Sequence, residues 1–133
     1  KPSHQTMTHL YEHLGKVFYY IAAVDKTIRK EEIEKLKQII KTEWLPLETS
    51  FNDFNDDSAY EIEIVFDWLV ANGWDFEQVI PDFKFFRNEH KHLFTPAINA
   101  LILQTANAIA YAFSGKNKSE HVLINQLNSI LFQ

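Results

Sequence analysis

Two carboxylates, Asp25 and Glu32, flank a turn within the stretch AAVDKTIRKEEIEKL, which covers residues 22–36. One helical pattern stops at Asp25, and Glu32 falls just inside the next. Because hard cations such as Mg²⁺ and Ca²⁺ prefer oxygen ligands, the pair could form a weak divalent-cation site. The alternative is structural. Asp25 would close the turn by accepting backbone N–H bonds, and Glu32 would be favourable in the first turn of a helix.

A second set of metal-ligand types lies in HLYEH, residues 9–13, which matches the H-x-x-E-H pattern of inverted zinc peptidases. His9 and His13 are four residues apart, so both can reach one ion, with Glu89 as a conceivable third ligand. At about 100° per residue, however, Glu12 points away from the apolar stripe that the histidines border. A metal-dependent hydrolase that uses His9, Glu12 and His13 is one alternative function, and a purely structural interaction domain without metal is another. Two flanking histidines are the simpler interpretation of this motif.

Aromatic residues are concentrated in DFKFFRNEH, residues 82–90. On a helix, Phe83 and Phe86 can face the core while Phe85 faces elsewhere. An exposed Phe85, with Trp74 and Phe94 nearby, would form a patch that binds a partner. The alternative is a helix between two layers that buries all three phenylalanines.

The composition narrows the class of protein. A net charge of −5 without a basic face argues against a nucleic-acid partner. The absence of cysteine excludes thiolate chemistry and suits a cytoplasmic location. No apolar run approaches the length of a membrane span, although an anchor upstream of Lys1 stays open. We expect a non-enzymatic module with a protein partner, and a homodimer also stays open.

Hydrophobic periodicity predicts an all-α fold of about six helices in a single domain, residues 1–133. Helices are expected over residues 4–24, 29–44, 58–72, 81–92 and 95–113, and from 119 to the C-terminus, with a short turn at 75–80. The first carries an apolar stripe of Leu10, Leu14, Val17, Ile21 and Val24. The helix over 58–72 contains IEIVFDWLVA, which is apolar almost all round, so we expect it to be the most buried.

Helix boundaries follow from capping residues. Ser58 with Glu61 and Asp75 with Gln78 have the spacing of a capping box. Thr95 precedes a proline, as at a helix start, and Gly73 is a natural C-terminal stop. These signals predict where the helices begin and end.

A weak internal repeat relates residues 21–40 to residues 109–131. Ile21-Ala22 aligns with Ile109-Ala110, and the later apolar positions align after a three-residue insertion. Each copy would be a helical hairpin, and two such hairpins can face each other around a pseudo-twofold axis. The alternative is that any two amphipathic hairpins look alike.

The stretch IAAVDKTIRKEEIEKL resembles the signature of the TerB-like family, whose members include tellurite-resistance proteins and the N-terminal domain of a membrane-anchored co-chaperone. The matching positions are Asp25, Ile28, Glu32 and Ile33. Lys26 and Arg29 stand where the family usually has Gly and Ser. The resemblance implies an all-helical fold with two pseudo-repeats, a metal cation near the turns, and a role in stress-response or membrane-associated complexes.

Only Asp25 and Glu32 carry over from the acidic residues that the family is thought to use for its cation. In the second copy Glu32 falls opposite Leu123, and Asp25 falls opposite Phe113 or Lys116. A paired site would therefore be incomplete. The resemblance implies at most one cation, Mg²⁺ or Ca²⁺, at Asp25 and Glu32.

Overall fold

The computed structural model describes residues 4–24, 28–46, 59–73, 76–114 and 118–132. Within these ranges every regular element is helical, which confirms the predicted all-α fold. The α-helices are α1 (His4–Ala23), α2 (Lys30–Ile39), α4 (Tyr60–Asn72), α5 (Val79–Glu89), α6 (Pro96–Ser114) and α7 (Lys118–Leu131). A π-helical turn, η1 (Ile40–Trp44), continues α2, and the 3₁₀ turns η2 (Phe76–Gln78) and η3 (Lys91–Leu93) flank α5.

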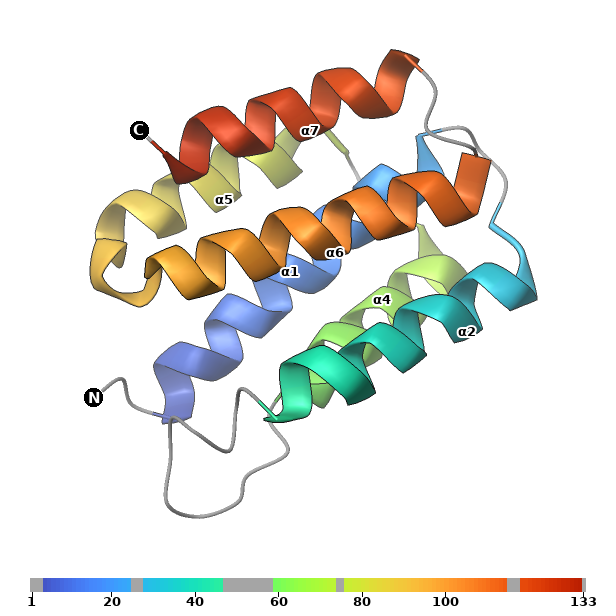
Figure 1. The fold of residues 1–133 in the computed structure, drawn as a ribbon, viewed down its shortest axis with the longest axis horizontal. Coiled ribbons are helices and arrows are strands. Elements are labelled where there is room, and N and C mark those ends of the chain that lie inside the picture. Colours follow the sequence, from blue (N-terminus) through green and yellow to red (C-terminus); the bar gives the residue numbers. More distant parts are fainter. Residues whose placement is uncertain (1–3, 25–27, 47–58, 74–75, 115–117, 133) are drawn as a thin grey trace.

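The helices pack around α1 and α6. Helix α1 contacts α4, α5 and α6, and α6 also contacts α2 and α7. Figure 1 shows α6 crossing in front of α1, with α5 and α7 on one side and α2 and α4 on the other. Helices α6 and α7 pack against each other, whereas α2 packs on α6. None of the described helices is both long and apolar enough to cross a membrane.

The core is built on the stripe that the sequence predicts for α1. Leu10, Leu14, Val17 and Ile21 are all buried there. Trp44 at the end of η1 is also fully buried, and its indole packs edge-on against the ring of Tyr11 at a centroid distance of 6.3 Å. Because a buried indole N–H needs an acceptor, it is satisfied from α6: Trp44 Nε1 donates to Thr105 Oγ1 over 3.0 Å.

A glycine allows α1 and α4 to approach closely. A Cβ added at Gly15 would lie 2.8 Å from Val65 Cβ and 2.9 Å from the carbonyl oxygen of Ile62. The first atom is the side-chain carbon attached directly to the backbone of α4, and the second is a backbone oxygen of α4. Neither is the end of a flexible side chain, so neither can move aside without moving the helix. Gly15 therefore sets the spacing of the two helices.

Several predicted helix boundaries are confirmed, and one is wrong. Thr95 Oγ1 accepts the backbone N–H of Ile98, and Gly73 ends α4 with φ of 80°. Helix α5, however, begins at Val79 rather than at Pro81. Pro81 lies in its first turn, where a missing N–H removes no helical bond. The predicted caps Ser58 and Asp75 lie outside the described residues.

The expectation that the helix over 58–72 is the most buried is wrong. Helix α4 buries Ile62, Phe66 and Leu69 but exposes Ile64 and Trp68 on its other side. Its apolar residues therefore form two faces, and only one of them contributes to the core.

Candidate functional site

Glu32 lies at the start of α2 and is only 7% exposed. Its Oε1 accepts the backbone N–H of Arg29 over 2.9 Å, so the carboxylate caps the helix. Glu32 lies in the first turn of α2, as the structural interpretation predicts. Its Oε2 is buried and has no hydrogen-bond partner among the described residues. One oxygen of Glu32 is thus engaged in the cap, and the other is left to serve a further partner.

The predicted partner of Glu32 in a cation site, Asp25, lies outside the described residues. In the part of the chain that the structure describes, no three His, Asp or Glu side chains are placed to hold a metal ion. Glu32 itself fits the role of a ligand through one oxygen only. The cation site stays a prediction.

The second predicted ligand set, His9, His13 and Glu89, is not assembled as a metal centre within the described residues. His9 is exposed, whereas the His13 ring packs against Phe86 of α5 at a centroid distance of 4.5 Å. Burial of the imidazole, helped by the charge of Lys16, lowers the pKa of His13 to about 4. His13 is therefore a neutral ring that joins α1 to α5.

His13 and Phe86 both line a surface pocket of about 280 Å³. The pocket is otherwise lined by residues from α5 and its C-terminal end: Asp82, Phe85, Glu89 and His90. Phe83 and Phe86 are buried and Phe85 is 69% exposed, as the sequence predicts. Phe94 is buried, so it adds nothing to an exposed patch, and Trp74 lies outside the described residues.

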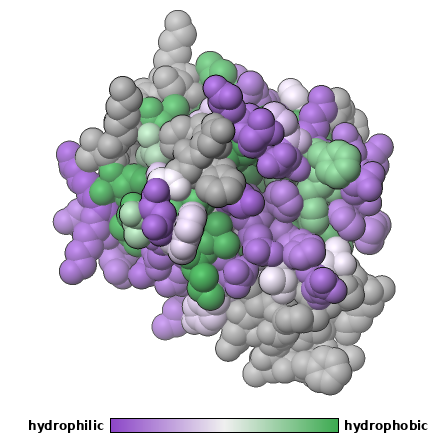
Figure 2. Space-filling model, turned by 180° about the vertical axis from the view of Figure 1, so that it is seen from behind, coloured by the Kyte–Doolittle hydropathy of each residue, from purple (hydrophilic) through white to green (hydrophobic). Residues whose placement is uncertain are grey.

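The exposed face of α4 was missed by the sequence reasoning. Tyr60, Ile64 and Trp68 are 37%, 56% and 54% exposed, and their four-residue spacing puts them on one side of the helix. We call these three residues the α4 stripe. It extends over about 12 Å of helix. Figure 2 shows hydrophobic side chains reaching the surface on the side of the molecule where α4 lies. The available signal was the continuous apolar character of IEIVFDWLVA, which supplies more apolar residues than one buried face can use.

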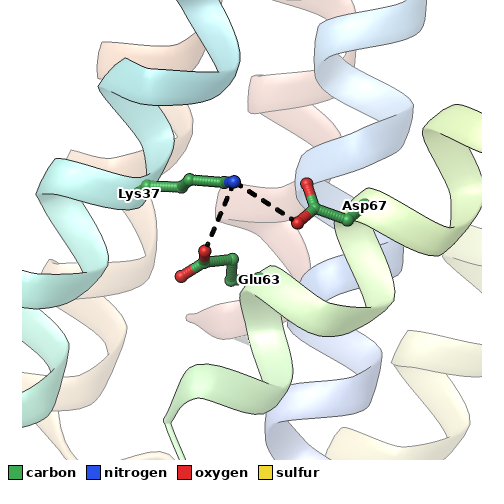
Figure 3. A network of polar contacts seen from close by, with 3 residues as sticks. All are labelled: Lys37, Glu63 and Asp67. Atoms are coloured by element: carbon green, nitrogen blue, oxygen red, sulfur yellow. Dashed lines mark ion pairs between the residues drawn. The ribbon is translucent and has the colours of Figure 1, made fainter.

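Acidic residues border the α4 stripe. Glu61 follows Tyr60 on one side, and Glu63 and Asp67 lie toward α2 on the other. Lys37 of α2 extends between the latter two, with Nζ 3.6 Å from Glu63 Oε1 and 3.5 Å from Asp67 Oδ2 (Figure 3). The carboxylate of Asp67, followed by that of Glu63, raises the pKa of Lys37. Among the described residues of α2 and α4 named here, three carboxylates outnumber one ammonium, so this border of the stripe is negative.

Comparison with known proteins adds no relative: no family model, no curated protein and no solved structure matches this chain significantly.

Proposed function

We propose that the protein is a non-enzymatic adaptor module that binds an amphipathic helix of a protein partner along the α4 stripe. The observation that carries the proposal is the exposure of Ile64 and Trp68 in register on a helix whose opposite face is fully buried. Isolated apolar residues on a surface are ordinary, but a row of them at helical spacing is typical of interaction sites.

The geometry of the stripe favours a helical occupant. Side chains at four-residue spacing present ridges that fit between the side chains of a second helix. Partner helices of this kind are recognised through anchors at the same spacing. The apolar length of about 12 Å matches two to three turns of such a helix.

The charges at the border of the stripe indicate the character of the occupant. Glu61, Glu63 and Asp67 outnumber the single ammonium of Lys37, so a partner helix with Lys or Arg beside its apolar face is complementary. A second copy of this chain would bring the same carboxylates against each other, at least in part. We therefore propose a basic amphipathic helix rather than a homodimer.

The test is a titration of the intact chain with two designed helical peptides that share one apolar face and carry either Lys or Glu beside it. We expect the Lys peptide to bind and the Glu peptide to bind at least tenfold more weakly. Trp68→Ala should weaken binding of the Lys peptide tenfold or more, which is the loss expected for an aromatic anchor at an interface. Tyr111→Ala, which removes an exposed aromatic residue from α6, is the matched control and should have no effect.

Two results of the titration would refute the proposal. One is equal loss of binding in Trp68→Ala and Tyr111→Ala. The other is equal affinity for the two peptides, since the acidic border would then have no role in choosing the partner. Sedimentation of the chain without peptide measures its oligomeric state. A stable dimer through α4 would also refute the proposal, because a second copy would then occupy the stripe.

A second function is favoured by the unpartnered Oε2 of Glu32: weak binding of Ca²⁺ or Mg²⁺ at the turn before α2. Calorimetric titration of the metal-stripped chain tests it. Glu32→Gln keeps an oxygen for the cap and removes the charge, so it should abolish the heat of binding. The single variant Asp25→Ala should abolish it as well. Glu31→Gln, an exposed neighbour, should retain it. Heat that persists in Glu32→Gln would exclude this site.

The TerB-like resemblance belongs to the same proposal. It is supported by the motif positions Asp25, Ile28, Glu32 and Ile33 and by the all-helical fold. It would place the module in a stress-response complex in the cytoplasm, with the α4 stripe as the surface that meets the partner.

A further inference from the structure

The pocket between α1 and α5 has an ordered arrangement of side chains that the proposed function does not use. Asp82, Phe85, Phe86 and Glu89 line it from one helix. Their spacing of three, four and seven residues puts them on one face of α5. The order along that face is acid, aromatic, aromatic, acid.

The aromatic part of the pocket is built from both helices. Phe86 is buried and is flanked by two imidazoles, with centroid distances of 4.5 Å to His13 and 4.5 Å to His90. Phe85 is exposed at the rim. The π faces of such rings attract cations as well as apolar groups.

The ionisable groups around the pocket leave it negative. Asp82 and Glu89 are the carboxylates among its lining residues, and the charge of Lys16 of α1 acts on His13. His13 adds no charge near neutral pH, because its pKa is about 4. His9 and His90 are the other imidazoles that act on His13. Among these described groups, two carboxylates outnumber one ammonium.

The two carboxylates are far apart along the helix. Seven residues separate Asp82 from Glu89, which is about 10 Å of helical rise. One small cation cannot contact both across that distance. A linear chain with a positive charge at each end can do so while its methylene groups lie over the phenylalanines.

We propose that the pocket on α5 binds an aliphatic polyamine, with its two terminal ammonium groups at Asp82 and Glu89. The chain between them, including the secondary ammonium of spermidine, would lie over Phe85 and Phe86. The pocket volume of about 280 Å³ suits a ligand of this size rather than a drug-sized molecule. A single lysine side chain of a partner has related chemistry but only one ammonium, so it would use one end of the site.

The proposal is tested by NMR titration of the intact chain with spermidine, putrescine and butylamine at low salt. Affinity should fall in that order, because putrescine is shorter than spermidine and butylamine has a single ammonium. Asp82→Asn and Glu89→Gln should each weaken the binding of spermidine about two- to fivefold, as expected for the loss of one exposed ion pair. Phe85→Ala should weaken all three amines.

The matched control must lose the same charge elsewhere, since any acidic chain attracts polycations. Glu31→Gln with Glu34→Gln removes two exposed carboxylates from α2 and should leave binding unchanged. The double variant Asp82→Asn with Glu89→Gln should weaken the binding of spermidine by the product of the two single effects, roughly four- to 25-fold.

Three results would overturn the proposal. Equal weakening in the two double variants would show attraction to net charge alone. Equal affinity for butylamine and spermidine would show a site for one ammonium, such as a lysine side chain. No change in the signals of residues 82–90 at millimolar spermidine would show that the pocket takes no amine. The helical content of each variant should equal that of the parent chain, which shows that the variants being compared are folded.

Discussion

Gly15 should be the position in α1 at which the smallest possible addition does measurable harm. Alanine normally stabilises a helix interior by about 1 kcal/mol relative to glycine. Here the added methyl would lie 2.8 Å from Val65 Cβ, roughly 1 Å inside the ordinary separation of about 3.5–4.0 Å. The carbonyl oxygen of Ile62, 2.9 Å away, is fixed in the backbone of α4. The two helices must therefore move apart.

Overpacking of this kind costs about 1–3 kcal/mol, and displacement of two helix backbones belongs at the upper end. Set against the gain in helix propensity, Gly15→Ala should lower the free energy of unfolding by about 1–2 kcal/mol. Gly15→Val should lower the free energy of unfolding further, since two more methyl groups would meet Val65 and Ile62 of α4.

Urea unfolding followed by circular dichroism measures the effect, with an unchanged slope indicating that the unfolded state is the same. Gln5→Ala, at an exposed position on the same helix, is the control and should stay within about 0.5 kcal/mol of the parent chain. If Gly15→Ala proves as stable as the parent, α1 and α4 are not in close contact at this position.

Three further changes have defined consequences. Thr105→Val removes the acceptor of the buried Trp44 indole and should cost about 1–3 kcal/mol in urea unfolding, whereas a cost near zero would mean that no such bond forms. Because the pKa of His13 is about 4 when folded and 6.5 as its ordinary value, the unfolded chain takes up the proton first, and stability is lost as pH falls from 6.5 to 4. The loss should be about 1–2 kcal/mol after allowance for partial solvent exposure, and it should vanish in His13→Gln but not in the exposed His92→Gln. Glu32→Ala removes the cap of α2 and should cost about 1 kcal/mol in thermal unfolding, more than Glu32→Gln; equal stability of the two would contradict the capping role.

The parts of the fold that the sequence predicted are those that depend on local pattern. The stripe of α1 is buried because Leu10 and Leu14 repeat at helical spacing. Thr95 caps α6 because its hydroxyl lies three residues before a free backbone N–H. Phe83 faces inward and Phe85 outward for the same reason of spacing.

The parts that were not predicted depend on contacts between distant segments. Periodicity cannot show which of two apolar faces of α4 meets a neighbour, so the whole helix was expected to be the most buried. The pocket on α5 is completed by His13, which precedes Phe86 by more than seventy residues. The sequence placed the start of α5 at Pro81 rather than at Val79, although a proline is tolerated anywhere in a first helical turn.

The most direct test of the central claim is site-specific photocrosslinking of the intact chain to the Lys-bordered amphipathic peptide. A photoreactive phenylalanine replaces Ile64 in one variant and Tyr111 in the other, so both probes are exposed on a helix. The adaptor proposal predicts a crosslinked product from position 64, competed away by unlabelled peptide, and none from position 111. Equal crosslinking from both positions, or from position 111 alone, would contradict α4 as the binding surface.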